Sequence, residues 1–158
     1  MNGDVKAIIL NIFSNIGHEE LPVEETTVAG QHIFSIQIPE ADLALFANNP
    51  DVINALDHLV KKIVEKNTVA SPTAPGNEDR FSFLVDIGGK RIAQIKDLES
   101  RAMMMADRAR SFQYDVELAP MSAYERLIVH TTLQDSPKVR TESQGEGFNR
   151  RVVIKYVA

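Results

Sequence analysis

A long amphipathic segment near the middle of the chain, Lys90–Phe112, constrains the possible folds more than any other part of the sequence. Apolar residues recur along it at the spacing of one helix face, which predicts a helix of about six turns with a buried seam. The predicted seam consists of Ile92, Ile95, Leu98, Ala102, Met105, Ala109 and Phe112. One strand-like segment, Phe81–Ile87, precedes this helix in the sequence, and another, Tyr114–Leu118, follows it. The sequence therefore predicts an α+β chain in which one long helix joins two small units.

The segment before the long helix alternates between helical and extended periodicity. The predicted order is helix, strand, strand, helix, helix, strand, assigned to Val5–Ile16, Val23–Ala29, Gln31–Ile38, Ala41–Ala47, Asp51–Lys66 and Phe81–Ile87. Residues Thr68–Asp79 are rich in Pro, Ser and Thr without periodicity, and they connect a helix to a strand of the same sheet. We therefore interpret them as a long loop inside a domain.

The segment after the long helix begins a second helix with a recognisable start signal. Ser122 and Glu125 have the spacing of a capping box, which predicts a helix over Ser122–Leu133. Arg126 and His130 are four residues apart on this helix, so they share one face. A helical wheel places Tyr124, Leu127 and Ile128 on another side, where we expect them to pack on the sheet.

A hairpin is predicted to end the chain, with strands over Val139–Thr141 and Arg150–Tyr156. In the last strand Arg151, Val153 and Lys155 alternate with Val152, Ile154 and Tyr156, so one face is apolar and the other carries two cations. Arg150, Lys138 and Arg140 can extend this basic patch, or all of these cations can be solvated charges that protect a sheet edge. Phe148 fits either a stacking role or packing within the turn.

Two stretches, Met121–Gln134 and Gly145–Ile154, together resemble the R-x-x-x-H ("R-three-H") domain, in the version found in the bacterial Jag (SpoIIIJ-associated) family. The resemblance implies binding of single-stranded RNA or DNA by Arg126, His130, Arg150, Arg151 and Lys155. Arginine can bind a phosphate with two parallel N–H groups or stack on a base, and a protonated histidine favours an anion. The alternatives are a surface ion pair for Arg126, for example with Glu142, and a hydrogen bond from His130 to a loop.

The order of elements over residues 5–87 is similar to the type II KH arrangement, αββααβ, which precedes the R-x-x-x-H domain in the Jag family. KH domains clamp the nucleic-acid backbone with a GXXG loop between two helices. The four residues at that place are Ala47, Asn48, Asn49 and Pro50, which lack both glycines and the basic central residues. Because Asn-Asn-Pro is also a good helix-start sequence, we interpret this half mainly as a scaffold or a protein-contact surface.

Composition excludes several classes of function. The chain has no cysteine, which rules out disulfides, thiol catalysis and cysteine-ligated metals. Its four histidines lack metal-ligand spacing, so no metal or cofactor is expected, and no catalytic motif is present. Asp86 is the one strand-end carboxyl group that looks placed for chemistry, and it has no evident partner in the sequence. No apolar run is long enough to span a bilayer and the start lacks a secretory pattern, so we expect a cytoplasmic protein without direct membrane insertion.

The charge distribution favours the end of the chain as the binding part. Net charge is −5, but residues 120–158 carry 6 Lys/Arg against 4 Asp/Glu, whereas residues 1–119 carry 11 against 18. We therefore expect two domains, a KH-like domain over 1–88 and an R-x-x-x-H domain over 89–158 with helices on a small sheet (αβαββ). The predicted function is non-catalytic binding of single-stranded RNA or DNA. The alternative is a Jag-type protein-interaction adaptor, linked to cell-envelope or division control, whose partner contacts the KH-like surface.

Overall fold

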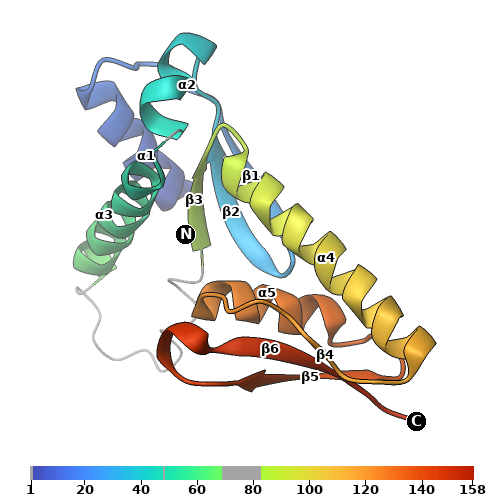
Figure 1. The fold of residues 1–158 in the computed structure, drawn as a ribbon. Coiled ribbons are helices and arrows are strands. Elements are labelled where there is room, and N and C mark those ends of the chain that lie inside the picture. Colours follow the sequence, from blue (N-terminus) through green and yellow to red (C-terminus); the bar gives the residue numbers. More distant parts are fainter. Residues whose placement is uncertain (1, 48, 69–82) are drawn as a thin grey trace. The chain divides into compact units, whose positions relative to one another are not determined.

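The computed structural model describes residues 2–47, 49–68 and 83–158, and it confirms the α+β class (Figure 1). The chain divides into two compact units, Met1–Ile92 and Ala93–Ala158, and the division falls within one long helix. The predicted loop over residues 68–79 lies almost entirely outside the described residues. Among the helices that the structure describes, none combines the length and the apolar character needed to cross a bilayer.

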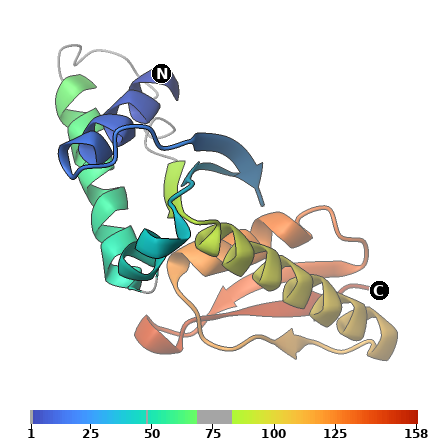
Figure 2. The ribbon, with the colours of Figure 1, turned by 90° about the horizontal axis from the view of Figure 1, so that it is seen from above.

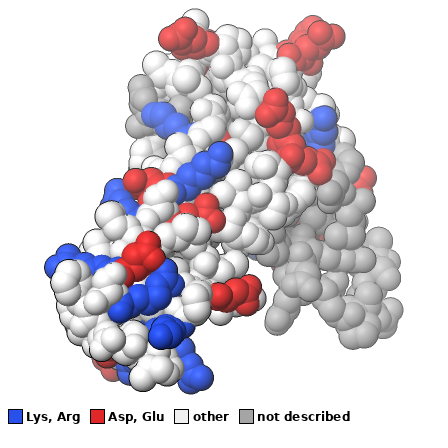
Figure 3. All heavy atoms as spheres, turned by 90° about the vertical axis from the view of Figure 1, so that its right-hand side faces the viewer, with Lys and Arg blue, Asp and Glu red and all other residues white. Residues whose placement is uncertain are grey.

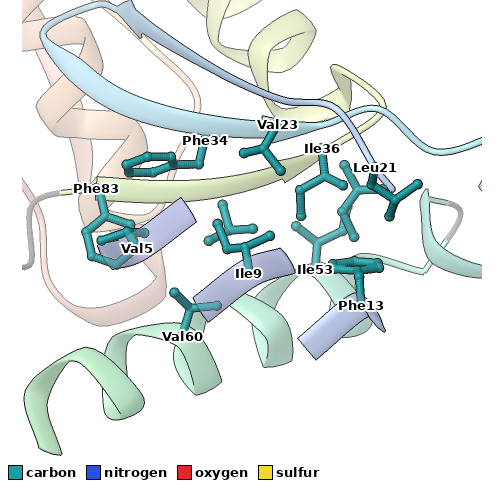
Figure 4. Packing of buried hydrophobic residues seen from close by; sticks show 12 residues of the cluster. Val5, Ile9, Phe13, Leu21, Val23, Phe34, Ile36, Ile53, Val60 and Phe83 are labelled. Atoms are coloured by element: carbon teal, nitrogen blue, oxygen red, sulfur yellow. The ribbon is translucent and has the colours of Figure 1, made fainter. Parts of the chain in front are cut away.

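The amino-terminal unit has the predicted order αββααβ. Its elements are α1 (Asn2–Asn15), β1 (Val23–Val28), β2 (Gln31–Ile36), α2 (Glu40–Ala47), α3 (Pro50–Thr68) and β3 (Phe83–Ile87). Strand β2 lies in the middle of the sheet, antiparallel to β1 and parallel to β3. Helices α1 and α3 pack on one face of this sheet (Figure 4). Their shared core contains Val5, Ile9, Phe13, Phe34, Ile36, Ile53, Val60, Phe83, Val85 and Ile87.

Asp86, for which the sequence showed no evident partner, has two hydrogen-bond partners in this unit. It lies on β3, on the sheet face opposite Val85 and Ile87, and it is fully buried. Its Oδ2 accepts a hydrogen bond from Ser35 Oγ (2.8 Å), and its Oδ1 accepts one from the backbone N–H of Arg91 (2.8 Å). The Asp86 side chain therefore connects β2 to the first turn of the long helix, where free backbone N–H groups need acceptors.

The carboxy-terminal unit also has its predicted elements, αβαββ. They are α4 (Lys90–Phe112), β4 (Val116–Glu117), α5 (Ala123–Leu133), β5 (Val139–Gln144) and β6 (Arg151–Tyr156), with the 3-10 turn η2 (Gly147–Asn149) inside the hairpin. The sheet order is β4-β6-β5, and both pairs are antiparallel. Helices α4 and α5 lie on the same side of this sheet (Figure 2). The core between them consists of Ala102, Ala106, Ala109, Val116, Val129, Leu133, Val139, Val152 and Ile154.

The buried residues of α4 are mostly alanines, and they differ in part from the predicted seam. Three alanines of α4 are fully buried, whereas Phe112, which we expected in the buried seam, is 67% exposed. Met103 and Met104 are also more than half exposed, whereas the next residue, Met105, packs against the core. The predicted seam is therefore correct in its middle and wrong at its carboxy-terminal end.

Candidate nucleic-acid interface

Helix α5 positions Arg126 through its own first turn. The predicted capping box is present: Ser122 Oγ accepts from the N–H of Glu125, and the Glu125 carboxylate accepts from the N–H of Ser122. The partly buried side chain of Arg126 folds back toward this turn, where its Nη1 donates to the Met121 carbonyl (2.9 Å). Because this bond uses one donor of the planar guanidinium, the remaining N–H groups can still bind a ligand in a fork.

His130, one turn further along α5, contacts the edge strand β5. Its Nδ1 lies 2.6 Å from Thr141 Oγ1, so the histidine is hydrogen-bonded to a strand rather than to a loop. Burial lowers the pKa of His130 below its ordinary value, and the positive charge of Arg126 lowers it further. The ring is therefore mainly neutral near pH 7, and the contact with Thr141 leaves Nε2 for another partner.

Arg150 lies beside the amino-terminal end of α5, where Arg126 is anchored. Its carbonyl accepts a hydrogen bond from the N–H of Met121 (3.1 Å), the residue whose carbonyl holds Arg126. Its Nε donates to Ser143 Oγ (3.0 Å) on β5, and the guanidinium is exposed. The structure thus brings together three of the five predicted binding residues with two strand hydroxyls. We call this the α5–β5 surface, defined by Arg126, His130, Thr141, Ser143 and Arg150.

The other two predicted binding residues, Arg151 and Lys155, lie on the opposite face of the sheet. In the β5–β6 register Thr141 pairs with Ile154, on the face that the helices cover. Because side chains alternate along a strand, Arg151 and Lys155 point away from that face. The structure therefore does not join all five residues into one basic surface.

Acidic neighbours already pair with these two cations. Arg151 Nε lies 2.7 Å from Glu117 Oε2, and Lys155 Nζ lies 2.7 Å from Glu142 Oε2. The hydrogen bond between Lys155 and Glu142 raises the pKa of Lys155 and lowers the pKa of Glu142. The interleaving of signs is also visible on the face drawn in Figure 3, where basic and acidic side chains lie next to each other. Glu142 thus forms its ion pair with Lys155. It does not pair with Arg126, so the alternative of an Arg126–Glu142 ion pair was wrong.

Comparison with known proteins identifies the unit that carries this surface. Residues 96–156 match the family model of the R-three-H domain. We therefore refer to residues 96–156, which match this family model, as the R-three-H domain. The Arg126–His130 pair and both strands of the hairpin fall within the matched residues.

Two bacterial relatives extend the similarity beyond the R-three-H domain. Both are named RNA-binding protein KhpB. The protein from Clostridium symbiosum is 29% identical over 110 residues, which are 70% of this chain and 46% of the relative. The protein from Bacillus subtilis (strain 168) is 34% identical over 114 residues, which are 71% of this chain and 50% of the relative. The chain therefore spans about half the length of these relatives, and the similarity confirms the resemblance to the Jag family.

Outside the R-three-H domain, the predicted degenerate KH loop contributes a helix start. Asn49 directly precedes α3, and its Oδ1 accepts a hydrogen bond from the N–H of Asp51 (3.0 Å), as the side chain of an N-cap residue does. Pro50 is the first residue of the helix. Ala47 is the last residue of α2, and Asn48 lies outside the described residues. The side chain of Asn49 thus has a structural role, as the helix-start interpretation expected.

Among the described residues, no three acidic or histidine side chains are grouped so that they could hold a metal ion.

One apolar residue of the R-three-H domain lies where sequence reasoning did not expect it. Leu127 is 50% exposed, although the helical wheel assigned it to the packing side with Ile128. In the structure, Ile128, Val129 and Leu133 are the buried residues of α5. Leu127 therefore lies on the exposed side of α5, where it offers an apolar surface to solvent.

Proposed function

We propose that the R-three-H domain binds single-stranded RNA, and also single-stranded DNA, at the α5–β5 surface without catalysing a reaction. The observation that carries this proposal is the gathering of Arg126, His130 and Arg150 around Met121 and the edge strand β5. Two guanidinium groups and the Ser143 hydroxyl suit a phosphate backbone, because they can donate to phosphate oxygens. Either the His130 ring or the Thr141 hydroxyl adds one more donor, depending on which of the two donates in the hydrogen bond between them. The names of both relatives support RNA as the ligand. The absence of cysteine from the sequence is compatible with work in a reducing cytoplasm, where we place the protein.

The number of charged contacts predicts a shallow dependence on salt. At about pH 7.5 only Arg126 and Arg150 of the α5–β5 surface are charged, because the pKa of His130 is lowered. With about 0.7 counterions released per contact, log K should fall with log salt at a slope near −1.4. Fluorescence anisotropy with a labelled ten-nucleotide uridine RNA at several salt concentrations measures this slope. A slope of zero, or no binding even at low salt, would contradict the proposal.

The lowered pKa of His130 predicts that RNA binds more tightly at acid pH. A phosphate beside Nε2 favours the protonated ring, so the pKa of His130 rises on binding from its lowered value in the free protein. Affinity should therefore increase about three- to tenfold as the pH falls from about 7.5 to about 5.5, since each unit of pKa difference is worth tenfold. The increase ends once the free protein is itself protonated. The measurement is the same anisotropy assay at three pH values.

Two histidine variants separate this effect from general changes in charge. His130→Gln should bind with nearly the same affinity at all three pH values. His58→Gln, a substitution of an exposed histidine on α3, should keep the pH dependence of the unmodified chain. Equal pH dependence in both variants would show that His130 does not contact the bound strand.

A second candidate function is a protein-interaction adaptor of the Jag type, linked to cell-envelope or division control. The observation that favours it is the internal pairing of Arg151 and Lys155 with glutamates, in a chain of net charge −5. The amino-terminal, KH-like unit would then offer the partner surface. The anisotropy assay at low salt decides between the two functions, because an adaptor that has lost RNA binding gives no signal at any salt concentration.

A further inference from the structure

Phe148, at the tip of the β5–β6 hairpin, has an exposure that packing does not explain. Its relative exposure is 104%, the highest among the exposed large apolar residues that the structure describes. Phe112, another exposed aromatic residue, lies 5.9 Å from the ring of Tyr114, whereas Phe148 makes no ring contact within the described part of the chain. Packing within the turn, one of the two roles that the sequence allowed, therefore does not occur.

The turn that carries Phe148 is closed by contacts between its two arms. Gly145 has a φ of +89°, and a Cβ atom there would lie 2.7 Å from the Asn149 carbonyl oxygen, so the close approach of the two arms requires glycine. Two backbone hydrogen bonds, Asn149 N to Glu146 O (3.1 Å) and Arg150 N to Gly147 O (3.3 Å), close the turn. The Arg150 side chain crosses to Ser143 on the other arm. An ordered turn thus holds a fully exposed ring.

The turn is joined to the α5–β5 surface through Arg150. Arg150 is two residues from Phe148, and its carbonyl accepts from the N–H of Met121, beside the anchor of Arg126. A strand whose phosphates contact Arg126 and Arg150 would bring the next base to the hairpin tip. Flat aromatic side chains next to a basic groove are the usual way in which proteins hold single-stranded bases, because every base has a π-face.

We propose that Phe148 is a stacking platform for one base of the bound strand, an inference that rests on the proposed function. The site takes a nucleobase of any identity, since the ring offers no hydrogen-bond donor or acceptor to read its edge. Specificity for single strands follows, because a base inside a duplex has no free face for the ring.

Removal of the ring tests this directly. Phe148→Ala should weaken binding of the uridine RNA by about 5- to 150-fold, the usual range for loss of one base–aromatic stack. Because the ring is fully exposed, the variant should melt like the unmodified chain. The salt slope should stay unchanged, since no charge is lost, whereas Arg126→Ala should make the slope shallower by about 0.7. With an RNA whose bases are replaced by abasic sites, Phe148→Ala and the unmodified chain should bind equally.

A tryptophan reporter locates the contact. The chain contains no tryptophan, so Phe148→Trp introduces a single fluorophore at the tip, and Phe112→Trp is the matched control on another exposed aromatic position. Saturating RNA should quench the indole emission of Phe148→Trp strongly and leave that of Phe112→Trp nearly unchanged, because base stacking quenches indole emission. A change in the emission of Phe148→Trp with protein concentration alone would show that a second copy of the chain covers the ring, which would overturn the proposal.

The outcomes for the two proposals are distinguishable. If Arg126→Ala weakens binding but Phe148→Ala and the abasic RNA do not, the stacking platform is wrong and the proposed function stands. If the unmodified chain binds none of the RNA at low salt, both are wrong. If both variants weaken binding and only Phe148→Ala leaves the salt slope unchanged, both are supported.

Discussion

An Arg126→Ala variant is expected to bind the ten-nucleotide uridine RNA about 10- to 150-fold more weakly, because hydrogen bonds to charged groups contribute about 1.5–3 kcal/mol. The guanidinium is anchored by one N–H to the Met121 carbonyl and offers the others to the strand. Anchoring reduces the side-chain entropy lost on binding, so this arginine should contribute more than a mobile surface charge. The measurement is anisotropy at low and moderate salt, together with a thermal melt to verify the fold.

Two further variants make this test specific to the site. Arg126→Lys keeps the charge but loses the planar fork, so its affinity should fall between those of the unmodified chain and Arg126→Ala. Arg151→Ala is the matched control: it removes the same residue type from the same domain, but from the opposite sheet face and from an ion pair with Glu117. Its affinity should change by less than about threefold. Equal losses in Arg126→Ala and Arg151→Ala would indicate a diffuse charge effect rather than the α5–β5 surface.

The helices were the most predictable elements because their signals are local. The spacing of apolar residues gave α4 its observed bounds, Lys90–Phe112, and the capping box placed the start of α5 at Ser122. Strand bounds were less accurate, because the length of a strand depends on its partner. The strand expected over Tyr114–Leu118 is reduced to Val116–Glu117, where only two residues pair with β6. Conversely, β5 was expected to end at Thr141, but it extends to Gln144 because β6 continues opposite it.

The site was predictable where it depends on one helix and unpredictable where it depends on the sheet. A spacing of four residues was enough to place Arg126 and His130 on one face of α5. The position of Arg150 depends on the turn at Gly145–Asn149 and on the hydrogen bond to Met121. Because Met121 is distant from Arg150 in the sequence, a local sequence pattern cannot predict this contact. The alternation along β6 correctly separated a cationic face from an apolar one. Since the helices must cover the apolar face, Arg151 and Lys155 had to point away from α5.

Asp86→Ala is expected to lower the free energy of unfolding of the amino-terminal unit by about 2–5 kcal/mol. The variant leaves the buried Ser35 hydroxyl and the partly buried Arg91 N–H without their acceptor. A fully buried group without a partner costs about 1–3 kcal/mol, and a partly buried one costs less. A loss of this size is a large part of the total stability of a small domain, which is about 5–15 kcal/mol. Urea denaturation followed by far-ultraviolet circular dichroism measures the change.

Conservative and exposed substitutions show whether hydrogen bonding is the cause. Asp86→Asn keeps one acceptor oxygen and should therefore lose less stability than Asp86→Ala. Asp51→Ala removes an exposed acidic side chain from the first turn of α3 in the same unit, so it should cost less than about 1 kcal/mol. Below its melting temperature, Asp86→Ala should bind RNA like the unmodified chain, because its hydrogen bonds lie in the amino-terminal unit. An Asp86→Ala variant with unchanged stability but lost binding would return this carboxyl group to the list of functional candidates.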